Sequence, residues 1–381
     1  MIPAMHTRRK FHQLAVAALA LPAANRSRAQ ERRAIVLGQS VPLTGPAAQL
    51  GLQMQLGAKA CFDAINAAGG IAGMPIVLKT LDDGYDPARC KANTEKFIQE
   101  DVFALFGYVG TPTSLAALPL VNAAKIPFIA PFTGAEALRD PFNKLIFHVR
   151  ASYYDETELI VKQLTQLDIK NIAVFHQNDA YGQAGLKGVQ RALEKRGLQP
   201  AAVATVERNS IDVAAALKTL LPAKPEAIVQ ISAYKSCAAF IREARKAGYF
   251  GQFYNVSFVG TQALADELGK DAAGVVISQV MPSPFGTAAG LVNDYQQALH
   301  RLDPKAEPNY TSIEGYVGAR VIVDGLRRLG GRPSREALIG ALETLSGYES
   351  RGYQLHFGPT RHVGSSFVEL SMLTADGKVK R

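Results

Sequence analysis

Short hydrophobic runs alternate with longer amphipathic stretches along most of this chain. The runs at 34–40, 76–81, 102–106, 127–130 and 146–149 are predicted strands, and the stretches at 49–67, 87–99 and 113–124 are predicted helices. Short strands separated by helices indicate βαβ units, which build a parallel sheet. The first part of the chain is therefore predicted to form an α/β domain.

The same alternation begins again after residue 150. Helices are predicted at 155–167, 181–196, 213–221 and 235–247, and strands at 171–175, 201–205, 227–231, 252–255 and 274–280. Asp155 and Glu158 have the spacing of a capping box at the start of the first of these helices. The pattern thus predicts a second domain of the same class.

The C-terminal part follows a different order. After the breaker-rich segment 281–286, helices are predicted at 290–300, 311–329 and 334–345, and strands near 352–357 and 366–373. Three helices with no strands between them do not build a further βαβ domain. We expect them to return and cover the first domain, so that the chain crosses between two lobes several times.

Composition agrees with a soluble two-domain protein. The chain has 381 residues, of which 48% are hydrophobic and 20% charged. No uninterrupted apolar run is long enough to predict a membrane span. With 3 cysteines a disulfide scaffold is excluded, and we expect Cys61, Cys90 and Cys237 to be small buried residues, at least one of them unpaired.

The first 29 residues are predicted to be an export signal rather than part of the fold. They carry five basic residues and no acid, so the formal charge of +9 falls to +4 without them. A basic start, an apolar run from Leu14 to Leu21 and a small-residue cleavage site before Gln30 are typical of secretory signals. Arg8 and Arg9 fit a twin-arginine signal, and a general secretory signal fits as well. The mature chain is thus predicted to be periplasmic; the alternative is a basic tail that binds nucleic acid.

Known catalytic motifs are missing from the sequence. It has no nucleophile elbow, dinucleotide-binding glycine motif, phosphate-binding loop or zinc-protease motif. The histidines are scattered, and Asp82 and Asp83 fit a solvated turn better than an acid/base pair. Basic residues lack the aromatic interleaving of nucleic-acid binders. We therefore predict no enzyme, no metal, no cofactor and no nucleic-acid partner.

Glycine- and hydroxyl-rich turns follow three predicted strands of the first lobe. They are SVPLTGPAAQLG at 40–51, GYVGTPTS at 107–114 and APFTGAEALR at 130–139. In an open parallel sheet, ligands bind at this edge because helices begin there with unpaired N–H groups. Thr111, with Thr113 or Ser114 capping the helix, is suited to a carboxylate. The alternative is that these residues are only caps and turn formers.

The order of four segments carries a family resemblance. The segments are SVPLTGPAAQLG, AINAAGGIAGMPIVLKTLDDGYDP, FGYVGTPTSLAALPLVNAAKIPFIAP and IAVFHQNDAYGQAGL. The chain from about 34 to 373 resembles the periplasmic leucine/isoleucine/valine-binding proteins, the type I solute-binding components of ABC importers. The resemblance implies an α/β fold of two Rossmann-like lobes on a three-segment hinge. The first lobe is expected at 30–151 plus 282–356, and the second at 152–281 plus 357–381.

The resemblance also implies a set of ligand-binding residues. Thr111 matches the hydroxyl ligand to the substrate carboxylate, and Thr133 with Gly134 matches a second carboxylate-binding turn, with the threonine displaced by one position. Tyr181 and Tyr234 match the two tyrosines that meet the ligand from the second lobe. Leu50 stands where the family often has a tyrosine that lines the pocket.

Two departures from the family pattern bear on the ligand. The acid that neutralises the ligand ammonium aligns with Ser257, and no Asp or Glu lies between 244 and 265. Either the ligand lacks an α-amine or another acid takes this role. Glu314 is one candidate, and the alternative is that Glu314 is an acid on a helix surface. The first-lobe disulfide of the family is also missing, because Tyr85 and Gly110 hold the matching positions.

Three further residues lie near the predicted crossings between lobes. Arg150 either pairs with a ligand carboxylate or anchors the hinge to Asp155 or Glu156. Tyr153 and Phe285 either stack on a ligand or pack in the core.

The sequence thus predicts a monomeric binding protein that captures an amino acid or a related small carboxylate between closing lobes, with an ABC permease and ATPase as partners. The alternatives are the ligand-binding component of a sensory system and an exported α/β enzyme. The loss of the aligned acid favours aromatic or aliphatic carboxylic acids over branched-chain amino acids.

Overall fold

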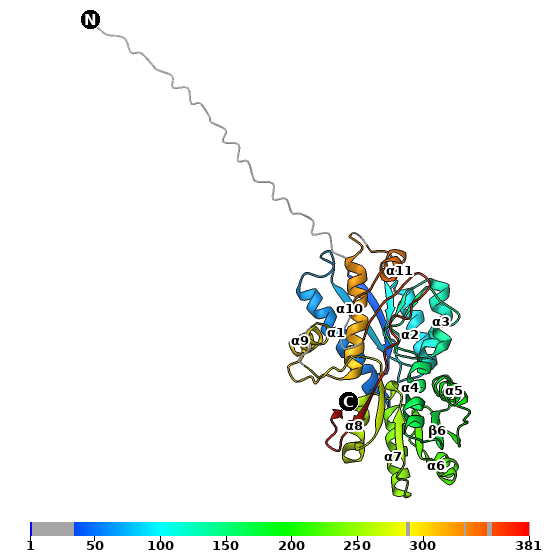
Figure 1. The fold of residues 1–381 in the computed structure, drawn as a ribbon. Helices are drawn as coiled ribbons and strands as arrows, with labels where there is room; N and C mark the ends of the chain where they lie inside the picture. The colour runs from blue at the N-terminus through cyan, green and yellow to red at the C-terminus, as the bar shows by residue number, and fades with distance from the viewer. Residues whose placement is uncertain (2–33, 287–289, 331–332, 349–352, 381) are drawn as a thin grey trace. The chain divides into compact units, whose positions relative to one another are not determined.

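The structure is a computed structural model that describes residue 1 and residues 34–286, 290–330, 333–348 and 353–380. The predicted export signal at 1–29 lies, apart from Met1, outside the described residues. Figure 1 shows the described helices and strands with the labels used below.

The first sheet has five parallel strands in the order β2-β1-β3-β4-β5. They are β1 (Ile35–Val41), β2 (Ile76–Asp82), β3 (Ala104–Phe106), β4 (Phe128–Ile129) and β5 (Ile146–Phe147). The central strands are almost continuously hydrophobic because helices cover both faces of the sheet.

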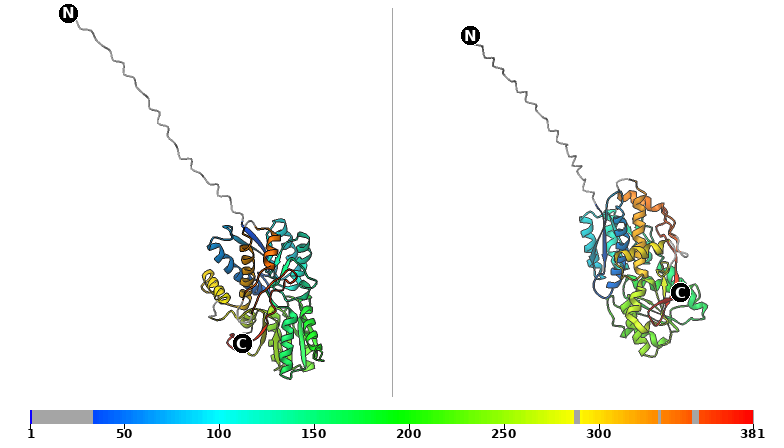
Figure 2. Two further views of the ribbon diagram at one scale, coloured as in Figure 1. Left: turned by 45° about the horizontal axis from the view of Figure 1, so that its top comes forward. Right: turned by 90° about the vertical axis from the view of Figure 1, so that its left-hand side faces the viewer.

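Helices from both ends of the chain cover this sheet. On one face, α1 (Ala48–Ala67) packs against α9 (Leu291–Leu302) and α10 (Tyr310–Arg327), and α10 packs against α11 (Arg335–Glu343). On the other, α2 (Pro87–Gln99) packs against α3 (Thr111–Ala124). Figures 1 and 2 show α10, in orange, beside α1, in blue. The three C-terminal helices therefore return to the first sheet.

The second sheet has the order β12-β11-β10-β9-β8-β6-β7. Its strands are β6 (Ile172–Gln177), β7 (Val203–Val206), β8 (Ala227–Ile231), β9 (Gln252–Asn255), β10 (Val276–Gln279), β11 (Glu369–Leu373) and β12 (Val379–Lys380). Those from β6 to β10 are parallel, and β11 is antiparallel to β10. The helices between β5 and β10 are α4 (Tyr153–Gln166), α5 (Ala180–Glu194), α6 (Ala214–Leu220), α7 (Tyr234–Lys246) and α8 (Thr261–Leu268). Short 3-10 helices are η1 (Glu136–Leu138), η2 (Leu221–Ala223), η3 (Ser257–Val259) and η4 (Gly269–Ala272).

The elements around the five-stranded sheet are here called the first lobe, and those around the seven-stranded sheet the second lobe. The chain crosses between them from β5 to α4, from β10 to α9 and from α11 to β11. Phe357 packs on Phe147 of β5, with ring centroids 5.2 Å apart. The lobe boundaries after 151, 281 and 356 stay predictions.

Several predicted local features were wrong in detail. The capping box of α4 is formed by Ser152 and Asp155, not by Asp155 and Glu158: the Ser152 hydroxyl accepts from the Asp155 N–H at 3.1 Å, and Asp155 accepts from the Ser152 N–H at 3.0 Å. Helix α3 begins at Thr111 after Gly110, and α8 was not predicted. Within 353–357 the structure has an isolated bridge from His356 to Ser346 rather than a strand.

The three cysteines are free and buried. Cys61 belongs to the core beneath α1, whereas Cys90 packs between α2 and the strands on the other face of the sheet. Within the described part of the chain, no helix combines the length and hydropathy needed to cross a membrane.

Candidate functional site

Two loops at the carboxyl end of the first sheet are paired with each other. Val109 forms a bridge with Phe132, and the Gly110 N–H donates to the Phe132 carbonyl at 3.2 Å. This pairing places the hydroxyl oxygens of Thr111 and Thr133 2.6 Å apart, and both residues are buried. The structure therefore joins two predicted site residues that are far apart in the sequence.

Thr111 occupies the first turn of α3. Gly110, the residue before the helix, has φ +103°, a conformation that favours glycine. The first N–H groups of a helix have no partner within it and carry the positive end of its dipole. Thr113 donates back to the carbonyl of Gly110 at 3.0 Å, whereas the buried Ser114 hydroxyl has no hydrogen-bond partner among the described residues. This end of α3 favours a negatively charged group.

Tyr153 extends the threonine pair toward the second lobe. Thr133 accepts a hydrogen bond from the Ala135 N–H at 3.2 Å and donates to the Tyr153 hydroxyl at 3.4 Å. The Tyr153 N–H donates to the Gly134 carbonyl at 2.8 Å. A Cβ on Gly134 would lie 2.6 Å from the Tyr153 ring, so only glycine permits this approach. Burial raises the pKa of Tyr153 to about 12.

Tyr181 faces this group from the start of α5, where Asp179 caps the helix by accepting the Tyr181 N–H at 2.9 Å. Its ring centroid lies 5.3 Å from that of Tyr153 and 4.4 Å from that of Phe258 in η3. The Tyr181 hydroxyl is buried and has no hydrogen-bond partner among the residues that the structure describes. Burial, reinforced by Tyr153, raises its pKa well above the usual value. Such a hydroxyl is available to a ligand.

Further aromatic rings lie beside Tyr181, and the sequence analysis did not single them out for ligand binding. Phe258 lies 5.4 Å from Phe132 and 6.0 Å from Tyr85, measured between ring centroids. Tyr85 fills the space above Gly110, where a Cβ would lie 2.3 Å from its ring. The Gln177 side chain of the second lobe donates to the Tyr85 hydroxyl at 3.2 Å. In the sequence, Tyr85 and Gly110 were noted only because they hold the two positions at which the family has a disulfide.

Arg150 lies at the centre of a buried charge cluster. Its Nη2 is 3.4 Å from Glu156 Oε1 and its Nη1 is 3.5 Å from Glu314 Oε1; the side chains of the arginine and Glu156 are 0% exposed. Arg150 also donates to the hydroxyl of Ser257. Burial opposes the charge on Arg150, but Glu314 and Glu156 outweigh it and raise its pKa. Of the predicted partners, Arg150 pairs with Glu156.

Glu156 of α4 lies beside Ser257 of η3, the residue that aligns with the acid of the family. It accepts the Ser257 N–H at 2.7 Å, the Ser257 hydroxyl at 3.0 Å and the Ser278 hydroxyl at 2.6 Å. Burial raises its pKa, and Arg150 with these donors works against the rise. An acid thus lies beside Ser257, although the local sequence has none.

The remaining predicted residues lie apart from this group. Tyr234 accepts a long hydrogen bond of 3.5 Å from the Gln49 N–H, and Leu50 lies against Gly260, where a Cβ would be 2.4 Å from its side chain. Phe285 is 39% exposed and meets the Tyr310 ring at 5.9 Å. Leu50 and Tyr234 therefore connect the lobes, while Phe285 is not brought to the threonine pair by any of these contacts.

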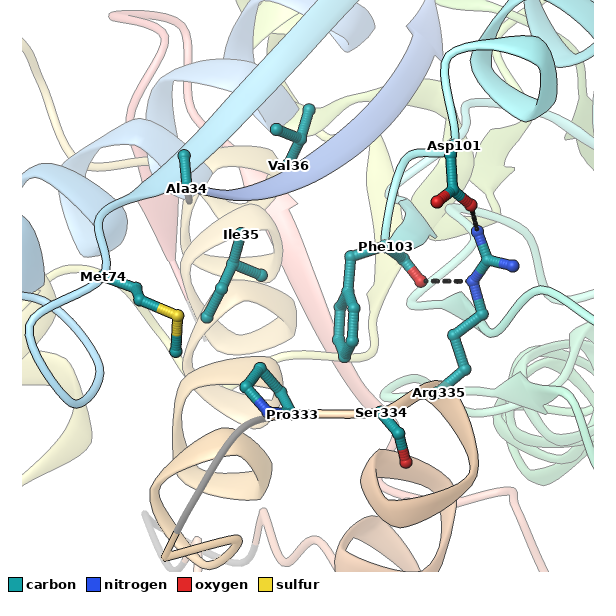
Figure 3. A pocket seen from close by; sticks show the side chains of 9 residues that line it. All are labelled: Ala34, Ile35, Val36, Met74, Asp101, Phe103, Pro333, Ser334 and Arg335. Carbon is teal, nitrogen blue, oxygen red and sulfur yellow. Dashed lines mark hydrogen bonds and ion pairs between the residues drawn. The ribbon is translucent and has the colours of Figure 1, made fainter. Parts of the chain in front are cut away.

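Another pocket lies at the opposite, amino end of the first sheet (Figure 3). It is lined by Ala34, Ile35 and Val36 at the start of β1, and by Phe103 and Arg335. The Arg335 guanidinium is held by Asp101 at 2.8 Å and by the Phe103 carbonyl at 3.2 Å. Its charge is already paired. Among the described residues, no cluster of three or more His, Cys, Asp or Glu is suited to hold a metal ion.

Two Rossmann-like lobes with buried hydroxyl, aromatic and charged groups between them define a two-lobed ligand-binding protein. The chain belongs to the family described as "Periplasmic binding protein", which it matches over residues 34–378.

Individual relatives agree with this membership. A crystal structure of a possible leucine/isoleucine/valine-binding protein from Rhodopirellula baltica SH 1 is 35% identical, with TM-score 0.87, and the similarity covers 92% of this chain and 96% of that one. A substrate-binding periplasmic protein from Ralstonia solanacearum is 29% identical, with TM-score 0.85, covering 91% and 99%. Leu/Ile/Val-binding protein homolog 7 of Brucella abortus (strain 2308) is 24% identical over 369 residues, 91% of this chain and 90% of that protein. These relatives are binding proteins rather than enzymes.

Proposed function

We propose that this protein is the exported solute-binding component of an ABC importer and that it captures an amino acid or a related small carboxylate between its lobes. The observation that carries the proposal is the pair of buried hydroxyls of Thr111 and Thr133, 2.6 Å apart at the first turn of α3. Hydroxyl and N–H donors at a helix start suit a carboxylate. The relatives named for leucine, isoleucine and valine support the same ligand class.

In this mechanism the ligand first docks on the first lobe. Its carboxylate accepts from the hydroxyls of Thr111 and Thr133 and from the N–H groups at the start of α3. The second lobe then closes and brings the Tyr181 hydroxyl, which has no partner among the described residues, and the Phe258 ring. Closure removes water and strengthens these hydrogen bonds. The closed form is the one presented to the permease, and a partner ATPase supplies the energy.

A binding screen tests the proposal. The purified chain without residues 1–29 is titrated calorimetrically with L-leucine, L-valine and L-phenylalanine and with the 2-hydroxy acids that carry the same side chains. We expect at least one to bind with micromolar affinity, about −8 kcal/mol, and to be recovered chemically unchanged. Absence of binding by the whole panel contradicts the ligand class, and turnover of a bound acid contradicts capture without chemistry. Loss of uptake of the bound acid by cells that lack the gene tests the importer.

A further inference from the structure

A turn of the first lobe is bonded to the second lobe at two adjacent residues. The turn is 83–85, which follows β2. The Asn209 side chain, in the loop after β7, donates to the Gly84 carbonyl at 3.1 Å. The Gln177 side chain, at the end of β6, donates to the Tyr85 hydroxyl at 3.2 Å. Residues far apart in the sequence thus join the two lobes through two hydrogen bonds.

Each partner in this contact is fixed within its own lobe. In the first lobe, the Tyr85 N–H donates to the Asp83 carboxylate at 2.8 Å. In the second lobe, the Ser236 hydroxyl of α7 donates to the Ser210 carbonyl, next to Asn209, at 2.7 Å. Because neither loop is free to follow the other, both hydrogen bonds between them must break when the lobes separate.

The backbone at this contact has an unusual conformation. Tyr85 and Asn209 both have φ +61°, in the left-handed region that residues other than glycine rarely adopt. Asparagine tolerates this conformation, whereas a bulky tyrosine keeps it only where surrounding contacts hold it. The Tyr85 ring covers Gly110, and the guanidinium of Arg208 from the second lobe lies 6.0 Å from the ring centroid. The second lobe therefore helps to hold Tyr85 in place.

We propose that Gln177 and Asn209 are positioning residues that fasten the turn 83–85 in the closed form and so set how fast a bound solute leaves. The inference rests on the proposed function and does not depend on which acid is bound. The lobes are closed here, since the Phe132 ring of the first lobe meets Phe258 of the second at 5.4 Å. Release requires the lobes to separate, so bonds that favour the closed form retain the solute longer.

The two hydrogen bonds join protein groups only. Their loss should therefore weaken every solute by the same factor, whatever its chemistry, because it changes the population of the closed form and not the contacts to the solute. A residue that touches the solute should instead discriminate between compounds. This difference makes the proposal testable before the natural solute is known.

The test measures release as well as affinity for L-leucine, L-valine, L-phenylalanine and the matching 2-hydroxy acids. Each compound that binds the wild-type protein is radiolabelled, and its release is followed after dilution into excess unlabelled compound. Asn209→Gly removes the side chain and suits the positive φ. Tyr85→Phe removes the other bond and keeps the ring. For each variant we expect release about 5-fold faster, with an unchanged association rate.

The matched control is Asn178→Ala. Asn178 is exposed and donates to Glu207 at 2.7 Å, so it contacts the same loop without reaching the first lobe. The control should keep the wild-type release rate. An unchanged rate in Asn209→Gly or Tyr85→Phe overturns the inference and leaves solute capture intact, and so does a loss confined to one compound. Absence of binding by the whole panel to the wild type removes the proposed function, and the inference with it.

A second measurement needs no solute. When the lobes separate, the turn 83–85 loses its cover and its bonds to Gln177 and Asn209, so its N–H groups should exchange with solvent more readily. Hydrogen exchange in peptides that contain this turn is followed by mass spectrometry without any added compound. We expect it to be about 5-fold faster in Asn209→Gly than in Asn178→Ala. Equal exchange in the two variants contradicts the proposal.

Discussion

The hydroxyl oxygens of Thr111 and Thr133 are 2.6 Å apart although the two residues follow different strands, β3 and β4. The backbone bridge between Val109 and Phe132 fixes the two loops that carry these threonines. Two hydroxyls fixed at a helix start need only rotate their protons to serve an anion. The site is therefore already formed by the backbone, and a ligand does not have to assemble it.

Thr111→Val should weaken a bound carboxylate by about 1–3 kcal/mol, because it leaves a polar partner in the buried site without its hydrogen bond. Calorimetric titration with the best compound of the screen measures the change. Thr165→Val is the control, since Thr165 bonds only to carbonyls of its own helix α4. Unchanged affinity of Thr111→Val would remove Thr111 from the site.

Tyr181→Phe should separate ligand binding from stability. The Tyr181 hydroxyl has no hydrogen-bond partner among the described residues, so its removal should not lower the free energy of unfolding. With the carboxylate bound, loss of its hydrogen bond should cost about 1 kcal/mol of affinity. Urea unfolding and calorimetry give the two values. Reduced stability without reduced affinity would mean that the hydroxyl has a structural role only.

Arg150→Met should destabilise the fold by roughly 3–5 kcal/mol, because it leaves Glu156 and Glu314 buried without their cation. Arg320→Met is the control: Arg320 is 29% exposed and its partners Asp294 and Asp324 are 50% and 25% exposed, so its loss should cost less than that of the fully buried Arg150. Urea unfolding of both variants checks the difference. Similar losses would show that the Arg150 cluster adds nothing specific.

The destabilisation of Arg150→Met should shrink as the pH falls. Burial already raises the pKa values of Glu156 and Glu314 in the folded protein, and loss of Arg150 raises them further. A carboxyl whose folded pKa lies above its unfolded value binds more protons in the folded state, so stability rises as the pH decreases through the folded pKa. Urea unfolding of variant and wild type between pH 8 and about 5 measures the effect. A constant or growing difference at low pH would contradict it.

Gly110→Ala should be more damaging than Gly45→Ala. Both glycines have positive φ, but a Cβ on Gly45 meets nothing within 4 Å, whereas on Gly110 it lies 2.3 Å from the Tyr85 ring. We expect a loss of about 1 kcal/mol for Gly45→Ala from backbone strain and roughly 2–4 kcal/mol for Gly110→Ala, where a clash is added. Urea unfolding ranks them. Equal losses would show that Tyr85 moves aside freely.

The cysteines should not react with Ellman's reagent in the folded protein. All three are buried and free, and burial raises the pKa of Cys61 to about 12. We expect three thiols to react after denaturation in guanidinium without reductant. Fewer than three would reveal an oxidised pair, and rapid reaction of the native protein would contradict burial.

The sequence predicted the architecture well because it depends on local periodicity. The predicted strand 227–231 and helix 87–99 match β8 and α2 to the residue. Helix α8, which has eight residues and a glycine on either side at 260 and 269, was missed. The cap of α4 was misplaced because Ser152 with Asp155 and Asp155 with Glu158 have the same spacing, and only the backbone selects between them.

The site was predictable only in part. Thr111 and Thr133 stand in turns that follow strands of one sheet, and parallel strands bring such turns together. Phe258 carries no comparable signal, and Glu156 was expected only as a partner of Arg150. Glu156 lies in an ordinary helical pattern, and its approach to Ser257 joins residues 101 positions apart on different elements. Contacts of this kind arise from the packing of whole lobes, which a local pattern does not encode.

The return of the last helices to the first sheet has a consequence for synthesis. On the ribosome, strands β1 to β5 emerge well before α9 and α10, which bury one face of α1. The nascent first lobe therefore keeps an uncovered apolar surface until residues beyond 320 have been translated. During that interval the unfinished surface is open to chaperones, and neither lobe can be produced by simply shortening the gene.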